Sequence, residues 1–273
     1  MKTTLFLIIF SFAMAANAQQ LEKLWTSAAD FQTPESALYN AELDIVFVAN
    51  MGQVRDTKNG DGFIAQMNLK GEITNLKWLT GLNDPKGMAI YNGKLYVADM
   101  DELIVIDIEE AKVVNKYLAP NAKFLNDVTV CKNGMVFVSD MRDQRIYALV
   151  DGNFDSWLYN ENLQNVNGLW AEGGKLYAGN ASVWEIDIKT KAMNELFGET
   201  QGIDGLEKLE NGEFIFSNWA GRIHVSKQQK VVTLLNRAEK QLNTADIDFV
   251  PHKNLVLVPT FFGNTVEAFT LAY

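Results

Sequence analysis

Gly93-Lys94-Leu95-Tyr96-Val97-Ala98-Asp99 is a run of strand-forming residues that follows a turn and ends in a small polar residue. Its mixture of apolar, aromatic and β-branched side chains is typical of a buried β-strand. Similar runs recur at a spacing of roughly 40 residues, which is typical of β-propellers built from four-stranded blades. The six runs are residues 44–50, 93–99, 134–140, 174–180, 212–218 and 254–260.

The segments around each run recur in the same order. A short strand-like segment precedes each run, a third segment follows it, and a fourth is present in every repeat except the last. One spare strand-like segment, at about residues 21–25, precedes the first repeat. Pairing this segment into the last repeat would close the ring and remove an open sheet edge. The sequence therefore predicts an all-β fold, a six-bladed β-propeller in which the N-terminal strand completes the last blade.

The first 18 residues have the layout of a cleaved secretory signal. Lys2 gives a positive start, residues 5–15 form an apolar run, and Ala16-Asn17-Ala18 offers small residues for cleavage. The apolar run is too short to cross a bilayer core of roughly 30 Å as a helix. We expect a periplasmic or secreted protein, with residues 19–273 forming one domain and no membrane span after signal cleavage.

Composition narrows the range of partners. The formal net charge is −10 and the pI is about 4.8, which argues against binding to nucleic acid. Cys131 is the only cysteine, so an internal disulfide is impossible. No segment has an evident oligomerisation pattern. We therefore expect a monomer that binds a small-molecule ligand or substrate.

Oxygen-bearing side chains recur immediately before the innermost strand of several predicted blades. In a propeller these positions meet at the mouth of the central tunnel. Four of them combine two carboxylates with two amides: Glu35, Asn126, Asn167 and Asp204. Such a set suits a hard divalent cation, most plausibly Ca²⁺, with Zn²⁺, Mn²⁺ or Mg²⁺ as other candidates. The alternative is that Asn167-Gly168 and Asp204-Gly205 are simply turns.

The motifs around these positions resemble those of the gluconolactonase and regucalcin propellers, also called senescence marker protein-like, with the paraoxonases as distant relatives. The matching segments are Thr33-Pro34-Glu35-Ser36, Leu125-Asn126-Asp127-Val128, Val166-Asn167-Gly168-Leu169 and Ile203-Asp204-Gly205-Leu206. The resemblance implies that Glu35, Asn167 and Asp204 hold the metal, with Asn126 as a ligand or a water-mediated neighbour. It implies metal-dependent hydrolysis of a lactone or ester, in which Asp204 helps to activate water. Sugar-acid lactones are the default substrate class.

Three further residues complete the predicted site. Asp127 is expected in a second shell around the metal, and Asp246 is a candidate for the second shell or for substrate binding. Lys86 could bind a carboxylate or phosphate, or it could be a solvated charge in an exposed turn formed by residues 83–86. The loop at residues 56–62 lacks the alternating oxygens of a calcium loop, and we expect a long hairpin that could overhang the tunnel mouth.

The sequence departs from the resemblance in two places. Phe124-Leu125 stands where some relatives have a substrate-binding arginine, and the histidine pair of the paraoxonases has no counterpart. The alternative function is therefore a non-catalytic ligand-binding or scaffold propeller with a structural metal. A quinone-dependent sugar dehydrogenase is disfavoured by the scarcity of histidine and of basic tunnel residues.

Overall fold

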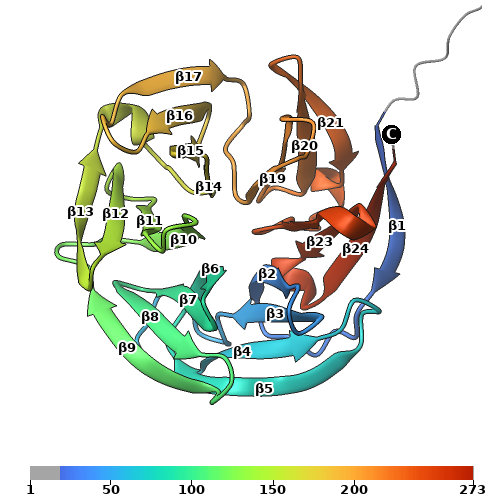
Figure 1. Cartoon of the computed structure of the whole chain (residues 1–273). Helices are drawn as coiled ribbons and strands as arrows, with labels where there is room; N and C mark the ends of the chain where they lie inside the picture. The colour runs from blue at the N-terminus through green and yellow to red at the C-terminus, as the bar shows by residue number, and fades with distance from the viewer. Residues whose placement is uncertain (1–18, 273) are drawn as a thin grey trace, which may run out of the picture.

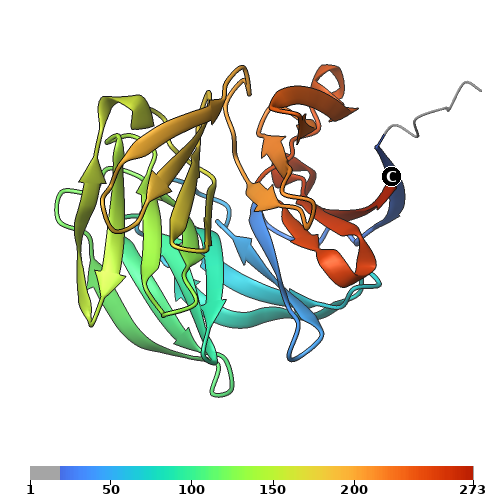
Figure 2. The ribbon, with the colours of Figure 1, turned by 45° about the horizontal axis from the view of Figure 1, so that its top comes forward.

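Six antiparallel sheets, each of four strands, stand in a ring around a central axis (Figure 1). They are seen in a computed structural model that describes residues 19–272. The predicted secretory signal lies outside the described residues. Figure 2 shows the ring tilted, with the blades side by side around the axis. The predicted six-bladed β-propeller is confirmed.

The first five blades are each made of four consecutive strands, ordered from the axis to the rim. Blades one to three contain β2 (Pro34–Asn40), β3 (Ile45–Asn50), β4 (Gly62–Met67) and β5 (Ile73–Leu82); β6 (Pro85–Tyr91), β7 (Lys94–Asp99), β8 (Glu102–Asp107) and β9 (Lys112–Leu118); and β10 (Leu125–Val130), β11 (Val136–Asp140), β12 (Arg145–Val150) and β13 (Asn153–Tyr159). Blades four and five contain β14 (Leu169–Glu172), β15 (Lys175–Gly179), β16 (Val183–Asp187) and β17 (Met193–Phe197); and β18 (Leu206–Lys208), β19 (Phe214–Asn218), β20 (Arg222–Lys227) and β21 (Lys230–Asn236).

The sixth blade is closed by the N-terminal strand. It is formed by β22 (Asp248–Val250), β23 (Leu255–Pro259), β24 (Val266–Ala272) and, at the rim, β1 (Gln20–Thr26). β1 pairs antiparallel with β24, and Leu21 lies opposite Leu271. The indole Nε1 of Trp25 donates a 3.0 Å hydrogen bond to the carbonyl of Leu69, which ties the closing strand to the first blade. The predicted pairing of the spare strand is confirmed.

The helical segments in residues 19–272 are single 3₁₀ turns, and none is long and apolar enough to cross a membrane. They are η1 (Glu161–Leu163), η2 (Ala238–Lys240), η3 (Pro251–Lys253) and η4 (Phe261–Gly263).

The hydrophobic core is divided among the interfaces between blades. Six clusters of buried apolar side chains each join two adjacent blades. In β3, Val46 and Val48 pack toward the sixth blade, whereas Phe47 and Ala49 pack toward the second. Successive side chains of a strand point to opposite faces of the sheet, and here both faces are buried. This is why the repeated runs are apolar without alternation.

Glycines at the inner strands allow neighbouring blades to approach closely. A Cβ atom on Gly205 would lie 2.4 Å from the backbone nitrogen of Ile247, and one on Gly168 would lie 2.7 Å from the carbonyl oxygen of Asp204. Neither glycine has a positive φ angle. These glycines therefore provide space at the axis, and neither is required there by a left-handed backbone conformation.

Candidate functional site

The four predicted metal ligands line one cavity of about 530 Å³, which we call the mouth cavity. Glu35, Asn126, Asn167 and Asp204 come from four different blades, at or just before the inner strands. Each is buried, with exposed fractions of 5%, 5%, 7% and 5%. The structure thus brings together side chains that lie up to 169 positions apart in the sequence.

The hydrogen bonds of this set, within the described part of the chain, leave a carboxylate oxygen of Glu35 unpaired. The Asn167 amide nitrogen donates a 2.8 Å hydrogen bond to Oδ1 of Asp204, whereas the amide nitrogen of Asn126 approaches the sulfur of Met141 at 3.6 Å. Within residues 19–272, Oε2 of Glu35 is buried and has no hydrogen-bond partner. A buried carboxylate oxygen without a donor is costly unless a cation or water satisfies it.

The electrostatics of the mouth cavity favour a bound cation. Burial raises the pKa of Glu35 well above its ordinary value; the nearby Asp204 raises it further, and Lys86 opposes the rise. Burial also raises the pKa of Asp204 to about 7, although the hydrogen bond from Asn167 lowers it. A divalent cation would stabilise both charged carboxylates.

The donor set fits a hard cation whose coordination is completed by other oxygens. Ca²⁺ takes six to eight oxygen ligands, often a mixture of carboxylates, amide carbonyls and waters. Residues 19–272 contain no cluster of three His, Cys, Asp or Glu side chains arranged to hold a metal. The two carboxylates and two amides supply four ligand groups, so a cation that takes six to eight oxygens would have positions left for water or substrate. A softer ion that prefers nitrogen or sulfur ligands fits this set less well.

Lys86 lines the mouth cavity but is not free. Its side chain is 2% exposed, and Nζ donates to Oδ2 of Asp84 at 2.8 Å and to the carbonyl of Asp84 at 2.9 Å. The same Nζ lies 4.6 Å from the ring centroid of Phe124. The alternative of a solvated charge in an exposed turn is therefore wrong. Because Asp84 already pairs with the ammonium group, Lys86 is a weak candidate for binding an anionic ligand.

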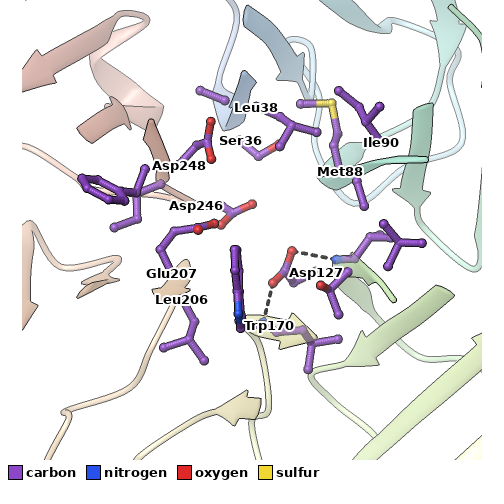
Figure 3. A pocket seen from close by; sticks show the side chains of 18 of the residues that line it. Ser36, Leu38, Met88, Ile90, Asp127, Trp170, Leu206, Glu207, Asp246 and Asp248 are labelled. Atoms are coloured by element: carbon purple, nitrogen blue, oxygen red, sulfur yellow. Dashed lines mark hydrogen bonds between the residues drawn. The ribbon is translucent and has the colours of Figure 1, made fainter. Parts of the chain in front are cut away.

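Asp127 and Asp246 lie further along the inner strands, outside the mouth cavity. They line a second cavity of about 330 Å³, which we call the inner cavity. Figure 3 shows the carboxylates of Asp127, Asp246, Glu207 and Asp248 around this space, together with the edge of Trp170. These two predicted site residues thus line a different cavity from the predicted ligands, although their carboxyl groups interact electrostatically with those of Glu35 and Asp204.

Hydrogen bonds from the side chain of Asp127 and from the main chain of Asp246 join neighbouring blades. Asp127 accepts 2.6 Å hydrogen bonds from the backbone N–H groups of Val128 and Leu169, which joins the third and fourth blades (Figure 3). The backbone N–H of Asp246 donates to the carbonyl of Glu35 at 2.9 Å, which joins the sixth and first blades. Both contacts hold inner strands that carry predicted ligands.

In five of the six repeats the Asp or Asn that ends the repeated run positions the loop before the inner strand, a role that the sequence did not reveal. These residues are Asn50, Asp99, Asp140, Asn180 and Asn218. Asp140 accepts hydrogen bonds from the backbone N–H groups of Lys123 and Phe124, at 2.7 and 3.0 Å. Asn218 donates to the carbonyl of Gly202 at 2.7 Å. Both side chains are buried. The recurrence of Asp or Asn at the end of the repeated run is the sequence signal that could have predicted this role.

The mouth cavity also has an apolar side wall, which the repeat pattern does not predict. It is formed by Met51, Phe124, Met141, Trp219 and Phe261. Trp219 is 46% exposed, and its ring centroid lies 5.5 Å from that of Phe261. The cavity therefore combines a polar base, formed by the predicted ligands, with an aromatic wall.

Comparison with known proteins supports the architecture. No protein-family profile and no curated protein sequence matches the chain. A streptogramin B lyase structure is 12% identical, with a TM-score of 0.66 over 93% of this chain and 98% of that one. The virginiamycin B lyase of Staphylococcus aureus is 14% identical, with a TM-score of 0.66 over 93% and 100% of the two chains.

A third match is the WD40 β-propeller domain of Doa1. It is 14% identical, with a TM-score of 0.65 over 86% of this chain and 77% of that one. At these identities the likeness concerns the fold, and propellers carry unrelated functions. The chain is thus similar to solved propeller structures along most of its length, and the chemistry of its mouth cavity must be argued from its own residues.

Proposed function

We propose that the protein is a metal-dependent hydrolase of a small lactone or ester, with Ca²⁺ as the most plausible metal. The observation that carries this proposal is the meeting of Glu35, Asn126, Asn167 and Asp204 around one cavity, with an unpaired carboxylate oxygen on Glu35. Two carboxylates and two amides at the base of an open cavity suit a hard cation that keeps positions free for substrate and water.

The residues of the mouth cavity divide the chemistry between them. Glu35, Asn126, Asn167 and Asp204 would hold the cation, which when bound would polarise the carbonyl of the substrate. Asp204 would take a proton from an attacking water in its charged form, which a bound cation would favour. The hydrogen bond from Asn167 fixes the orientation of this carboxylate. The aromatic wall would exclude competing water from the substrate.

The test is a turnover assay on purified protein with a broad panel of lactones and esters. Activity should disappear on chelation, return on addition of Ca²⁺, and be lost in Asp204→Asn. The matched control is Asp155→Asn, which alters an exposed aspartate on the outer strand β13. Absence of metal-dependent turnover on the whole panel would overturn the proposal.

Two of the similar structures are named as lyases, so elimination is the competing reaction. The two reactions differ in the source of the new oxygen atom. Hydrolysis in ¹⁸O-labelled water places one labelled oxygen in the acid product, whereas elimination places none. Mass spectrometry of the product therefore separates them.

A non-catalytic propeller with a structural metal is the second candidate. It is favoured by the contacts between blades at the site, since Asn167 and Asp204 belong to different blades and are hydrogen-bonded to each other. A cation bound there would hold the ring together. In that case Glu35→Gln would lower the melting temperature measured with calcium, while no compound of the panel would be consumed by the unaltered protein.

A further inference from the structure

Three arginines at the mouth cavity have no carboxylate partner, which is unusual in a chain with a net charge of −10. The chain has five arginines, and Arg145 and Arg237 each form an ion pair. Within residues 19–272, the guanidinium groups of the other three make no ion pair and donate no hydrogen bond. We call Arg55, Arg142 and Arg222 the rim arginines.

All three rim arginines are tied to the same cavity. Arg222 lines it directly. Cζ of Arg142 lies 4.1 Å from the ring centroid of Phe124, and Cζ of Arg55 lies 5.5 Å from that of Phe261. Both of these phenylalanines line the mouth cavity. The loop between β3 and β4 thus reaches the tunnel mouth through Arg55.

Stacking on an aromatic ring leaves the edge of a guanidinium group available. The planar group can pack its face on the ring while its N–H donors point to a carboxylate. Such charge-assisted hydrogen bonds are among the strongest that a side chain can offer a ligand. Lys86 cannot replace the rim arginines, because its ammonium group is paired with Asp84.

The charged side chains of the cavity differ in exposure. Glu35 and Asp204 are 5% exposed, whereas Arg222 is half-buried and Arg55 and Arg142 are exposed. A negatively charged ligand group is attracted to these three arginines. The planar guanidinium group of each can present two parallel N–H donors to a carboxylate.

We propose that the mouth cavity binds a ligand that joins a carboxylate to an aromatic or otherwise apolar body. The carboxylate is held by Arg222, which lines the cavity, while Arg55 and Arg142, from the first and third blades, add positive charge around the mouth. The apolar body lies against Phe124, Trp219 and Phe261. As a substrate class this rests on the proposed hydrolase function, and it is a carboxylate-bearing apolar lactone or ester rather than a neutral sugar-acid lactone.

Binding without turnover tests this inference separately from catalysis. The probes are 4-phenylbutyrate, its neutral analogue 4-phenylbutyramide, and butyrate, which lacks the ring. Calorimetric titrations should be run both with calcium and with chelator. The acid should bind at least about tenfold more tightly than the amide, because charged hydrogen bonds are lost in the amide. Butyrate should bind more weakly than 4-phenylbutyrate.

Variants assign the preference to particular residues. Arg222→Gln should remove most of the preference for the acid over the amide, and Arg55→Gln and Arg142→Gln should each reduce it by a few-fold. Arg145→Gln is the matched control, because Arg145 is already paired with Asp143. Arg55 and Arg142 are exposed, so their variants test the inference even if Arg222→Gln fails to fold.

Three results would overturn the inference. The first is equal binding of acid and amide, and the second is binding of neither. The third is a preference that survives all three arginine variants and disappears on chelation, because the cation would then hold the carboxylate. Loss of the proposed hydrolase activity in the turnover assay would leave these binding results unchanged.

Discussion

The side-chain nitrogen of Asn167 donates a 2.8 Å hydrogen bond to Oδ1 of Asp204 on the next blade. An amide has one acceptor oxygen and one donor nitrogen. Because Asp204 engages the nitrogen, the oxygen is the atom left to bind a cation. The contact therefore fixes a carboxylate and an amide as one unit that spans two blades.

Asn167→Asp should make stability depend more strongly on metal. Without metal, the new carboxylate would face Asp204 with no donor between them, and we expect a loss of about 1–3 kcal/mol. With calcium, the added carboxylate becomes a ligand and most of the loss should be recovered. Thermal denaturation with and without chelator measures both values. An equal loss in the two conditions would mean that no cation binds beside residue 167; Asn133→Asp, in a surface hairpin, is the control.

Calcium should raise the melting temperature of the unaltered protein. A ligand that binds only the folded state at 100 times its Kd adds about 2.7 kcal/mol to the free energy of unfolding. Glu35→Gln and Asp204→Asn should each abolish most of this increase, whereas Asp155→Asn should preserve it. Differential scanning calorimetry at increasing calcium concentration is the measurement. A melting temperature that does not change with calcium, magnesium, manganese or zinc would refute the metal site.

Asp248→Asn should stabilise the protein at neutral and alkaline pH. Asp248 is buried in the inner cavity and accepts a 2.7 Å hydrogen bond from the backbone N–H of Tyr39. Burial raises its pKa from 3.8 to about 7. As the pH rises, Asp248 therefore loses its proton in the unfolded chain before it does so in the folded protein. Its contribution to the free energy of unfolding falls between pH 3.8 and about 7 and is constant above that range.

The asparagine variant lacks this dependence and can still accept the hydrogen bond from Tyr39. Urea unfolding should show little difference between the two proteins near pH 4 and a gain for the variant of about 1–3 kcal/mol at pH 8. Taking the difference between the two proteins removes the contribution of other titrating groups. A gain that is the same at both pH values would contradict a raised pKa for Asp248.

Gly205→Ala should strongly destabilise the ring. The new Cβ would lie 2.4 Å from the backbone nitrogen of Ile247, which belongs to the next blade and cannot rotate away. We expect a loss of about 2–4 kcal/mol. The control is Gly198→Ala, where the nearest atom, at 3.1 Å, is the end of the Glu195 side chain. Urea unfolding of both variants is the measurement; similar small losses would show that the inner strands can separate at low cost.

The fold could be predicted because the repeats occupy equivalent places. Six similar runs, one missing outer strand and one spare strand at about residues 21–25 agree only with a closed six-bladed ring. The same equivalence predicted that Glu35, Asn126, Asn167 and Asp204 would meet. Each short motif is too unspecific to predict a metal ligand when taken alone. The prediction came from the equivalent position of the motifs in their blades.

The remaining features of the site depend on packing between blades. The sequence left two roles open for Lys86 because its partner Asp84 lies in the same turn-like segment, and only the ring buries both. Asp127 follows Asn126 directly but lines the other cavity, at a point where the register between β10 and β11 shifts. Trp219 lies in a connection that differs between blades. Arg222 begins β20 as Arg145 begins β12, but Arg145 is paired with Asp143, so position in the repeat does not reveal that Arg222 is unpaired in the part of the chain that the structure describes.

The seam between β1 and β24 has a consequence for how the molecule is made. Residues 20–26 can take their place as the outermost strand of the sixth blade only after residues 266–272 have been synthesised. Contacts between segments so distant along the chain form late, because a long loop must close first. An interrupted chain would therefore leave a ring with a free edge, which is a template for pairing with other copies. The exposed edge of β24 is therefore covered by β1 only after synthesis of the chain is complete.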